Sequence, residues 1–132
     1  VCIEKKVSKF IYISSVDAIN KEEEGLIRKE VEKYKTVGIL CKSIEHSNAL
    51  NDILKDEFKY NHLTIDTLSY SDGIMLAPTF LVKGLEFDAV MVVDADEENF
   101  CTEIDKQALY VASSRAMHRL EMLYSNKKPF SL

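Results

Sequence analysis

Two short runs of consecutive apolar residues, 37–41 and 89–93, constrain the fold of this chain more than any other feature of its sequence. A strand that is apolar at every position is buried on both faces, and such strands occur in parallel sheets that helices cover from both sides. The sequence therefore predicts a mainly parallel β-sheet with helices on both faces. Further short apolar runs, which predict additional strands, lie at 10–13, 63–65, 74–77 and 120–124.

Amphipathic segments between these runs predict helices. Residues 20–34 and 43–58 repeat apolar positions at the spacing of one helix face, and Ser43 can cap the second segment. A capping box that begins at Thr102 predicts a third helix, which we expect to run to about Ala116. Strands that alternate with helices indicate a three-layer α/β domain.

The chain has 132 residues, which fits a single domain over residues 1–132. It does not begin with Met, so we expect a segment of a longer protein. No apolar run approaches the roughly 18 residues that a membrane span needs, and the first residues contain no apolar signal-peptide stretch. We therefore expect a cytoplasmic protein without a membrane partner.

Charge and cysteine usage exclude several classes of function. The net charge of −5 argues against a free-standing domain that coats nucleic acid, because phosphate binding needs a basic surface. A contact with nucleic acid along one narrow edge stays compatible with this charge. The three cysteines and three histidines are scattered, so we expect reduced thiols, no disulfide framework and no metal site.

In α/β sheets, functional loops cluster at the carboxyl ends of the strands, and we expect three candidate segments at such places. The first follows the run 37–41, where Lys42 precedes the helix cap Ser43. A helix N-terminus beside a lysine can hold a phosphate. The alternative is a solvated lysine next to an ordinary cap.

The second candidate segment, 78–88, connects two predicted strands and carries Lys83, Gly84 and Glu86. Gly84 allows a backbone conformation, or a close approach of a ligand, that a Cβ would block. Glu86 can accept hydrogen bonds from the hydroxyl groups of a ribose. The alternative is an ordinary connection with solvated charges.

The third candidate segment, 109–120, is a predicted helix of small residues that ends in two serines and Arg115. A planar guanidinium with several N–H donors suits a phosphate better than a lysine does. The alternative is that Arg115 covers the carboxyl end of the helix, where cations are favoured in any case.

The second and third segments together resemble a known family. Residues 83–88, Lys-Gly-Leu-Glu-Phe-Asp, resemble motif V of UvrD-like superfamily 1 helicases, and residues 110–116, Tyr-Val-Ala-Ser-Ser-Arg-Ala, resemble their motif VI. Residues 40–43 resemble motif IV. The resemblance covers about residues 36–125 and implies the second RecA-like domain of such a helicase, an α/β fold of the P-loop NTPase type.

In this family two RecA-like domains clamp ATP, with Mg²⁺, between them. The resemblance implies that Glu86 contacts the ribose and that Arg115 contacts the γ-phosphate as an arginine finger, with Gly84 also at the nucleotide. Motif IV usually offers an arginine to the phosphates, and this chain has Lys42 there, without bidentate geometry. The chain has no Walker A loop, so the resemblance implies that the first RecA-like domain holds most of the ATP and that this chain alone is inactive.

The resemblance also implies contacts to single-stranded DNA from Thr79, Phe80 and Lys83, which lie where UvrD-type enzymes carry a Thr-Leu-His-like stretch. Phe80 can stack on a base, although a place in the core is the alternative. The stretch between Ser43 and Thr79 is too short for the large subdomain that UvrD and Rep enzymes insert. Residues 78–88, with the form Pro-x-x-x-x-Lys-Gly-Leu-Glu-Phe-Asp, look more like the HelD branch.

Two functions follow from this resemblance. The first is the C-terminal motor domain of an ATP-dependent DNA helicase or translocase, with the first RecA-like domain and single-stranded DNA as partners. The alternative is a HelD-like ATPase domain that remodels RNA polymerase mainly through protein contacts. Asp94 and Asp96 follow the run 89–93, and we interpret them as a solvated strand end rather than as Mg²⁺ ligands.

Overall fold

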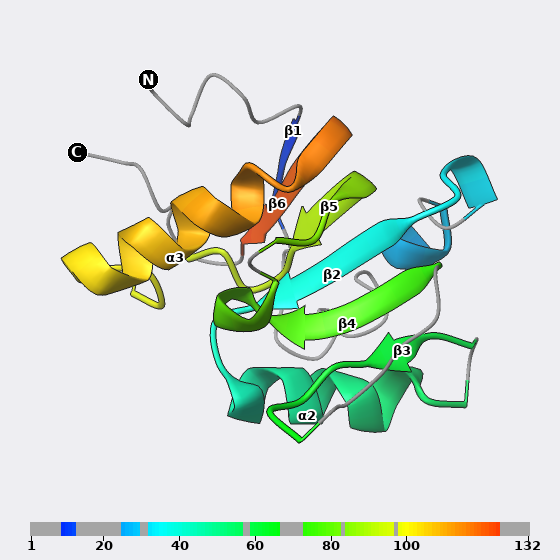
Figure 1. The fold of residues 1–132 in the computed structure, drawn as a ribbon, viewed down its shortest axis with the longest axis horizontal. Helices are drawn as coiled ribbons and strands as arrows, with labels where there is room; N and C mark the ends of the chain where they lie inside the picture. Colours follow the sequence, from blue (N-terminus) through cyan, green and yellow to red (C-terminus); the bar gives the residue numbers. More distant parts are fainter. Residues whose placement is uncertain are drawn as a thin grey trace.

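Within the part of the chain that the structure describes, the strands form one six-stranded sheet in the order β1-β6-β5-β2-β4-β3, and every neighbouring pair is parallel (Figure 1). This computed structural model describes residues 9–12, 25–29, 32–56, 59–66, 73–82, 84–96 and 98–124. The all-parallel sheet confirms the predicted α/β fold class. The strands are β1 (Lys9–Tyr12), β2 (Val37–Cys41), β3 (Asn61–His62), β4 (Ile74–Pro78), β5 (Phe87–Val92) and β6 (Ala116–Tyr124).

Most predicted strands are confirmed to within a few residues. The apolar runs at 37–41, 74–77, 89–93 and 120–124 are buried along most of their length. β2, which lies between β5 and β4, is buried at every position. The strand predicted at 63–65 is wrong in position, since β3 ends at His62 and Ile65 lies 68% exposed in a turn. β6 begins at Ala116, earlier than predicted. Residue 13 of the first predicted strand lies outside the described residues.

The helices begin at the predicted caps and end earlier than predicted. α2 (Ile44–Leu54) starts after Ser43, whose Oγ accepts a hydrogen bond from the His46 N–H. α3 (Glu103–Ser113) starts with a complete capping box between Thr102 and Asp105. Among the described residues, no helix has both the length and the apolar character that crossing a bilayer requires.

The first predicted helix, 20–34, is described only in part. Residues 25–29 and 32–33 are helical, and Tyr34 is not. Its predicted start and residues 30–31 lie outside the described residues, as do residues 57–58 at the predicted end of the second helix.

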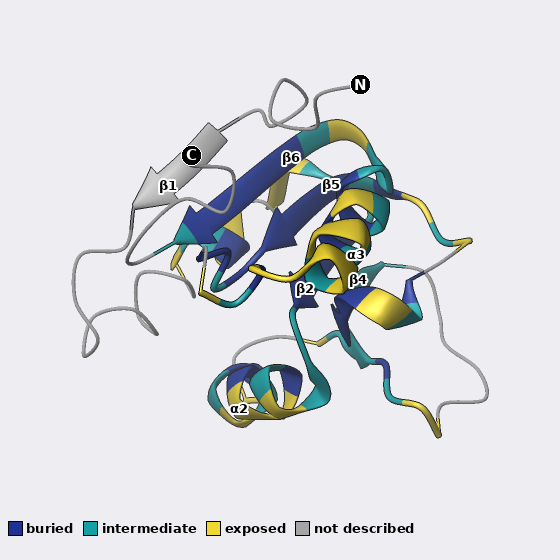
Figure 2. Ribbon diagram, turned by 90° about the vertical axis from the view of Figure 1, so that its left-hand side faces the viewer, coloured by how far each residue is buried: buried dark blue, intermediate teal, exposed yellow. Residues whose placement is uncertain are grey.

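Helices cover the two faces of the sheet, each above its own apolar cluster. Successive side chains of a strand point to opposite faces, and Ile39 and Leu40 of β2 accordingly belong to different clusters. α2 and residues 25–29 pack on the face of Ile39. α3 packs on the face of Leu40 together with the short 3₁₀ helix η2 (Thr79–Leu81). Figure 2 shows the resulting burial, with dark central strands and an exposed outer side of α3.

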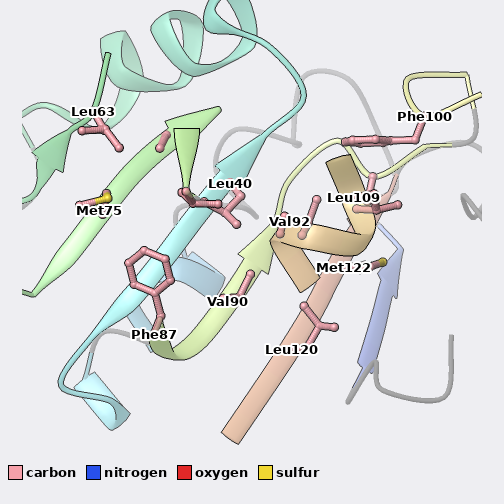
Figure 3. Close-up of a cluster of buried hydrophobic side chains, with 14 residues drawn as sticks. Leu40, Leu63, Met75, Phe87, Val90, Val92, Phe100, Leu109, Leu120 and Met122 are labelled. Carbon is pink, nitrogen blue, oxygen red and sulfur yellow. The ribbon is translucent and has the colours of Figure 1, made fainter. Parts of the chain in front are cut away.

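The cluster beneath α3 contains the ring of Phe100 and the side chains of Leu109, Val92 and Met122 (Figure 3). Phe100 is fully buried and lies two residues before the N-cap Thr102 of α3, so its ring ties the approach to this helix to the sheet. At the other end of the cluster, the ring of Phe87 lies over Gly38 of β2, where an added Cβ would come within 2.8 Å of the ring. This close approach explains a glycine in the middle of a buried strand.

Candidate functional site

The amino-terminal ends of β5 and β6 lie side by side and carry two of the predicted site residues. The Phe87 N–H donates a hydrogen bond to the Arg115 carbonyl oxygen, 2.8 Å away, at the place where the two strands begin to pair. Glu86 directly precedes Phe87, and its side chain is exposed. The structure therefore brings the main chains of Glu86 and Arg115 together at the amino-terminal ends of these strands. Figure 1 shows β5 and β6 side by side.

The expectation that all three candidate segments lie at carboxyl ends of strands is wrong for Glu86 and Arg115. The connection from β4 starts at the carboxyl ends of the parallel strands and returns to their amino ends before β5 begins. α3 likewise ends where β6 starts. Connections between parallel strands always return in this way, so a residue that directly precedes a strand lies at the amino ends of the strands.

The returning connection contains a glycine in the left-handed region of backbone space. Gly84 has φ of +85° and is exposed, and a Cβ built on it would meet nothing within 4 Å. The backbone conformation, rather than a lack of room, therefore favours glycine here. The Leu85 N–H bonds to the carbonyl of the buried Val82 at 3.0 Å, which anchors this turn to the core. Lys83 lies outside the described residues.

Arg115 lies in the turn between α3 and β6 and is half-buried. Its Nε and Nη2 groups donate to the Ser114 hydroxyl oxygen at 3.2 and 3.0 Å. The guanidinium thus bonds a hydroxyl rather than the last helix carbonyls, which argues against the alternative of a simple helix-end cover. Within the described residues it forms no ion pair, and neither of these hydrogen bonds uses Nη1.

Lys42 lies at the carboxyl ends of the strands, whereas Glu86 and Arg115 lie at the amino ends. It follows the carboxyl end of β2, and its Nζ is 3.8 Å from Oδ2 of Asp105 at the start of α3. Given the pairing of β2 with β5, Lys42 lies roughly 25 Å from the level of Glu86 along the strand direction. The structure therefore does not bring Lys42 to the same place as the other two predicted nucleotide contacts.

Thr79 and Phe80, like Lys42, lie at the carboxyl ends of the strands, directly after β4. The Phe80 ring is 52% exposed, so its alternative place in the core is excluded. Thr79 is buried, and its Oγ1 has no hydrogen-bond partner within the described residues. An exposed aromatic ring beside a polar backbone turn fits the stacking contact that the sequence predicted.

The interpretation of Asp94 and Asp96 as a solvated strand end is wrong. Asp96 is 3% exposed and Asp94 is half-buried, with a left-handed φ of 52°. Burial raises the pKa of Asp94 above its ordinary value, the charge of Asp96 raises it further, and His46 opposes both. Within the described residues, no group of three or more His, Cys, Asp or Glu side chains could hold a metal ion.

The exchange Asp94→Asn is expected to stabilise the chain at neutral pH. The folded state holds the carboxyl at a raised pKa, so ionisation costs the folded state free energy as the pH rises through that pKa. Asparagine removes this cost and tolerates the left-handed backbone. The gain in free energy of unfolding should be full above the folded-state pKa and vanish below the unfolded-state pKa. Urea titrations across acid and neutral pH measure it, with the exposed Asp66→Asn as the control. An equal effect at all pH values would contradict the prediction.

Two contacts of the predicted site residues carry no clear signal in the sequence. The Ser114 hydroxyl that holds the guanidinium stands in a pair of serines, and serines at helix ends commonly bond nearby carbonyls. The pairing of Lys42 with Asp105 joins residues far apart in the chain. Only the three-dimensional arrangement identifies either contact.

Comparisons with known proteins agree with this architecture. A model of the UvrD-like helicase C-terminal domain family matches residues 4–127. Comparison with curated protein sequences finds no match. Among solved structures, the chain is similar to the C-terminal domain of a possible DNA helicase from Lactobacillus plantarum WCFS1. The sequences are 28% identical, the TM-score is 0.69, and the match covers 96% of this chain and 83% of that one.

Two larger proteins share the fold at 8% sequence identity. The Sulfolobus solfataricus SWI2/SNF2 ATPase core in complex with dsDNA matches with a TM-score of 0.63, over 89% of this chain and 27% of that one. Arterivirus nonstructural protein 10, a helicase in complex with DNA, matches with a TM-score of 0.58, over 89% of this chain and 28% of that one. At this identity the likeness concerns the fold alone. Because the family match spans nearly the whole chain, this protein belongs to the UvrD-like helicase C-terminal domain family.

Proposed function

We propose that this chain is the second motor domain of an ATP-dependent superfamily 1 DNA helicase or translocase, and that it completes a nucleotide site held mostly by another domain. The observation that carries the proposal is that the main chains of Glu86 and Arg115 come together where β5 and β6 begin. The Phe87 N–H, directly after Glu86, donates a hydrogen bond to the Arg115 carbonyl oxygen. The Arg115 guanidinium has no carboxylate partner among the described residues.

Each side chain has a defined part in this proposal. The Arg115 guanidinium approaches the γ-phosphate of ATP and stabilises the negative charge that develops on the transferring phosphoryl group. The exposed Glu86 carboxylate accepts hydrogen bonds from the ribose hydroxyls. Gly84, with its left-handed backbone, keeps the approach to Glu86 free of a side chain. Mg²⁺ and the remaining phosphate contacts belong to the first RecA-like domain.

We propose that single-stranded DNA binds at the carboxyl ends of the strands, opposite the nucleotide site. The exposed Phe80 ring offers a stacking surface, while Thr79 has a buried hydroxyl beside it and Lys83 follows in the same connection. Lys42 lies at these carboxyl ends rather than beside Arg115, so we leave it out of the proposed nucleotide site.

A second candidate function is that of a HelD-like ATPase that remodels RNA polymerase. The net charge of −5 disfavours wide nucleic-acid contact, and two apolar side chains of α3, Ile104 and Tyr110, are 79% and 43% exposed. Co-purification of the full-length protein with RNA polymerase would support this candidate. Strand separation on a tailed duplex without polymerase would support the helicase instead.

The isolated chain is expected to show no ATP hydrolysis above the buffer rate, because it contains no Walker A loop to hold the β- and γ-phosphates. The full-length protein is expected to hydrolyse ATP, and single-stranded DNA should stimulate it. A coupled assay for released phosphate measures both proteins under the same conditions. Robust turnover by the isolated chain, or no turnover by the full-length protein, would refute the proposed division of the site.

A further inference from the structure

The hydroxyl of Ser114 contacts the helix behind it and the arginine in front of it. Its Oγ donates a hydrogen bond to the Val111 carbonyl oxygen at 2.7 Å. The same oxygen accepts the Nε and Nη2 groups of Arg115 at 3.2 and 3.0 Å. A serine hydroxyl has one proton to donate and two lone pairs to accept with, so these contacts use its whole capacity.

This arrangement fixes which edge of the guanidinium stays available. Because the hydroxyl proton is committed to Val111, both lone pairs of the Ser114 oxygen are directed to Arg115. They engage the edge of the guanidinium formed by Nε and Nη2. The other edge, formed by Nη1 and Nη2, keeps the parallel N–H donors that a phosphate can accept in a bidentate manner.

We propose that Ser114 is a positioning residue for Arg115, which holds the guanidinium in the orientation that presents its Nη1–Nη2 edge to the transferring phosphoryl group. This inference rests on the proposed function of Arg115 as the arginine finger. An arginine side chain has many rotamers, and ordering it only when ATP binds would cost free energy in the catalytic step. The bond to Ser114 orders the side chain before the nucleotide arrives.

The neighbouring Ser113 provides a matched comparison within the same turn. Its hydroxyl also donates to a helix carbonyl, that of Leu109, at 2.7 Å. It is 3% exposed and has no hydrogen bond to Arg115. Bonding to a helix carbonyl is therefore common to both serines, and the contact to the guanidinium is specific to Ser114.

The test uses the full-length protein with the variants Ser114→Ala, Ser114→Thr, Ser113→Ala and Arg115→Ala. Ser114→Ala is expected to lower kcat for ATP hydrolysis by about ten- to a hundredfold while KM for ATP stays near the wild-type value. Ser114→Thr keeps a hydroxyl and should restore most of the rate. Ser113→Ala should leave the rate near wild type, and the melting temperatures should show that all variants fold.

The double variant Ser114→Ala/Arg115→Ala separates positioning from a general structural role. If Ser114 acts through Arg115, its removal has no further effect once the arginine is gone. The same loss of rate in both backgrounds, or a rate for Ser114→Ala close to wild type beside a strong loss for Arg115→Ala, overturns the inference and leaves the proposed function intact. An unchanged rate for Arg115→Ala overturns the proposed function itself.

Discussion

Replacing Arg115 with alanine in the full-length protein is expected to lower the rate of ATP hydrolysis by about 10³–10⁵-fold. In the proposed role, the guanidinium meets charge that develops only as the phosphoryl group is transferred, so its removal should affect the rate rather than the binding of ATP. Single-turnover hydrolysis and the Kd of a fluorescent ATP analogue measure the two quantities separately. A steep loss of rate with a Kd close to the wild-type value is the expected pattern.

Two further exchanges show whether the effect belongs to the guanidinium. Arg115→Lys keeps the positive charge and loses the planar fork, so its rate should lie between those of wild type and Arg115→Ala. Lys106→Ala removes an exposed cation from α3 at the start of the same helix and should leave hydrolysis unchanged. If Arg115→Ala hydrolyses ATP at the wild-type rate, this side chain is not the finger.

Replacing Phe100 with alanine is expected to lower the free energy of unfolding of the chain by about 3–5 kcal/mol. Its ring is fully buried between the sheet and the start of α3, and alanine would leave a cavity that the neighbouring Leu109 and Met122 can fill only in part. A domain of this size is stable by about 5–15 kcal/mol, so the variant should lose a large part of its stability. Urea-induced unfolding, followed by circular dichroism, measures the difference.

Phe80→Ala is the matched control, because it makes the same chemical change at a ring that is 52% exposed. Its free energy of unfolding should change by less than about 1 kcal/mol. In the full-length protein, the same variant should weaken binding to single-stranded DNA by about 1–3 kcal/mol if the ring stacks on a base. Equal destabilisation by the two variants would contradict the burial that distinguishes them.

The sheet could be predicted from the sequence because its strands are apolar on both faces. Val37–Cys41 is buried at every position, and no helix-spaced pattern competes with that run. The capping box at Thr102 also located the start of α3, since that signal depends on side chains only three residues apart. Local patterns of this kind carry their own evidence, and tertiary contacts only confirm them.

The ends of the strands, and the site residues beside them, could not be predicted in the same way. Ala116–Tyr124 begins with residues that are partly or fully exposed, among them Met117 at 59%, so no apolar run marks the first part of this strand. The side of the sheet on which Glu86 and Arg115 lie depends on where each connection ends, which no local pattern encodes.

The hydrogen bond from the Phe87 N–H to the Arg115 carbonyl has a mechanical consequence. It sets the span between the backbones of two adjacent strand starts at the fixed interstrand distance of about 4.8 Å. Neither anchor can advance toward a neighbouring domain while the other stays behind. Any movement that displaces one of these strand starts relative to a neighbouring molecule therefore displaces the other with it, as long as this hydrogen bond is intact.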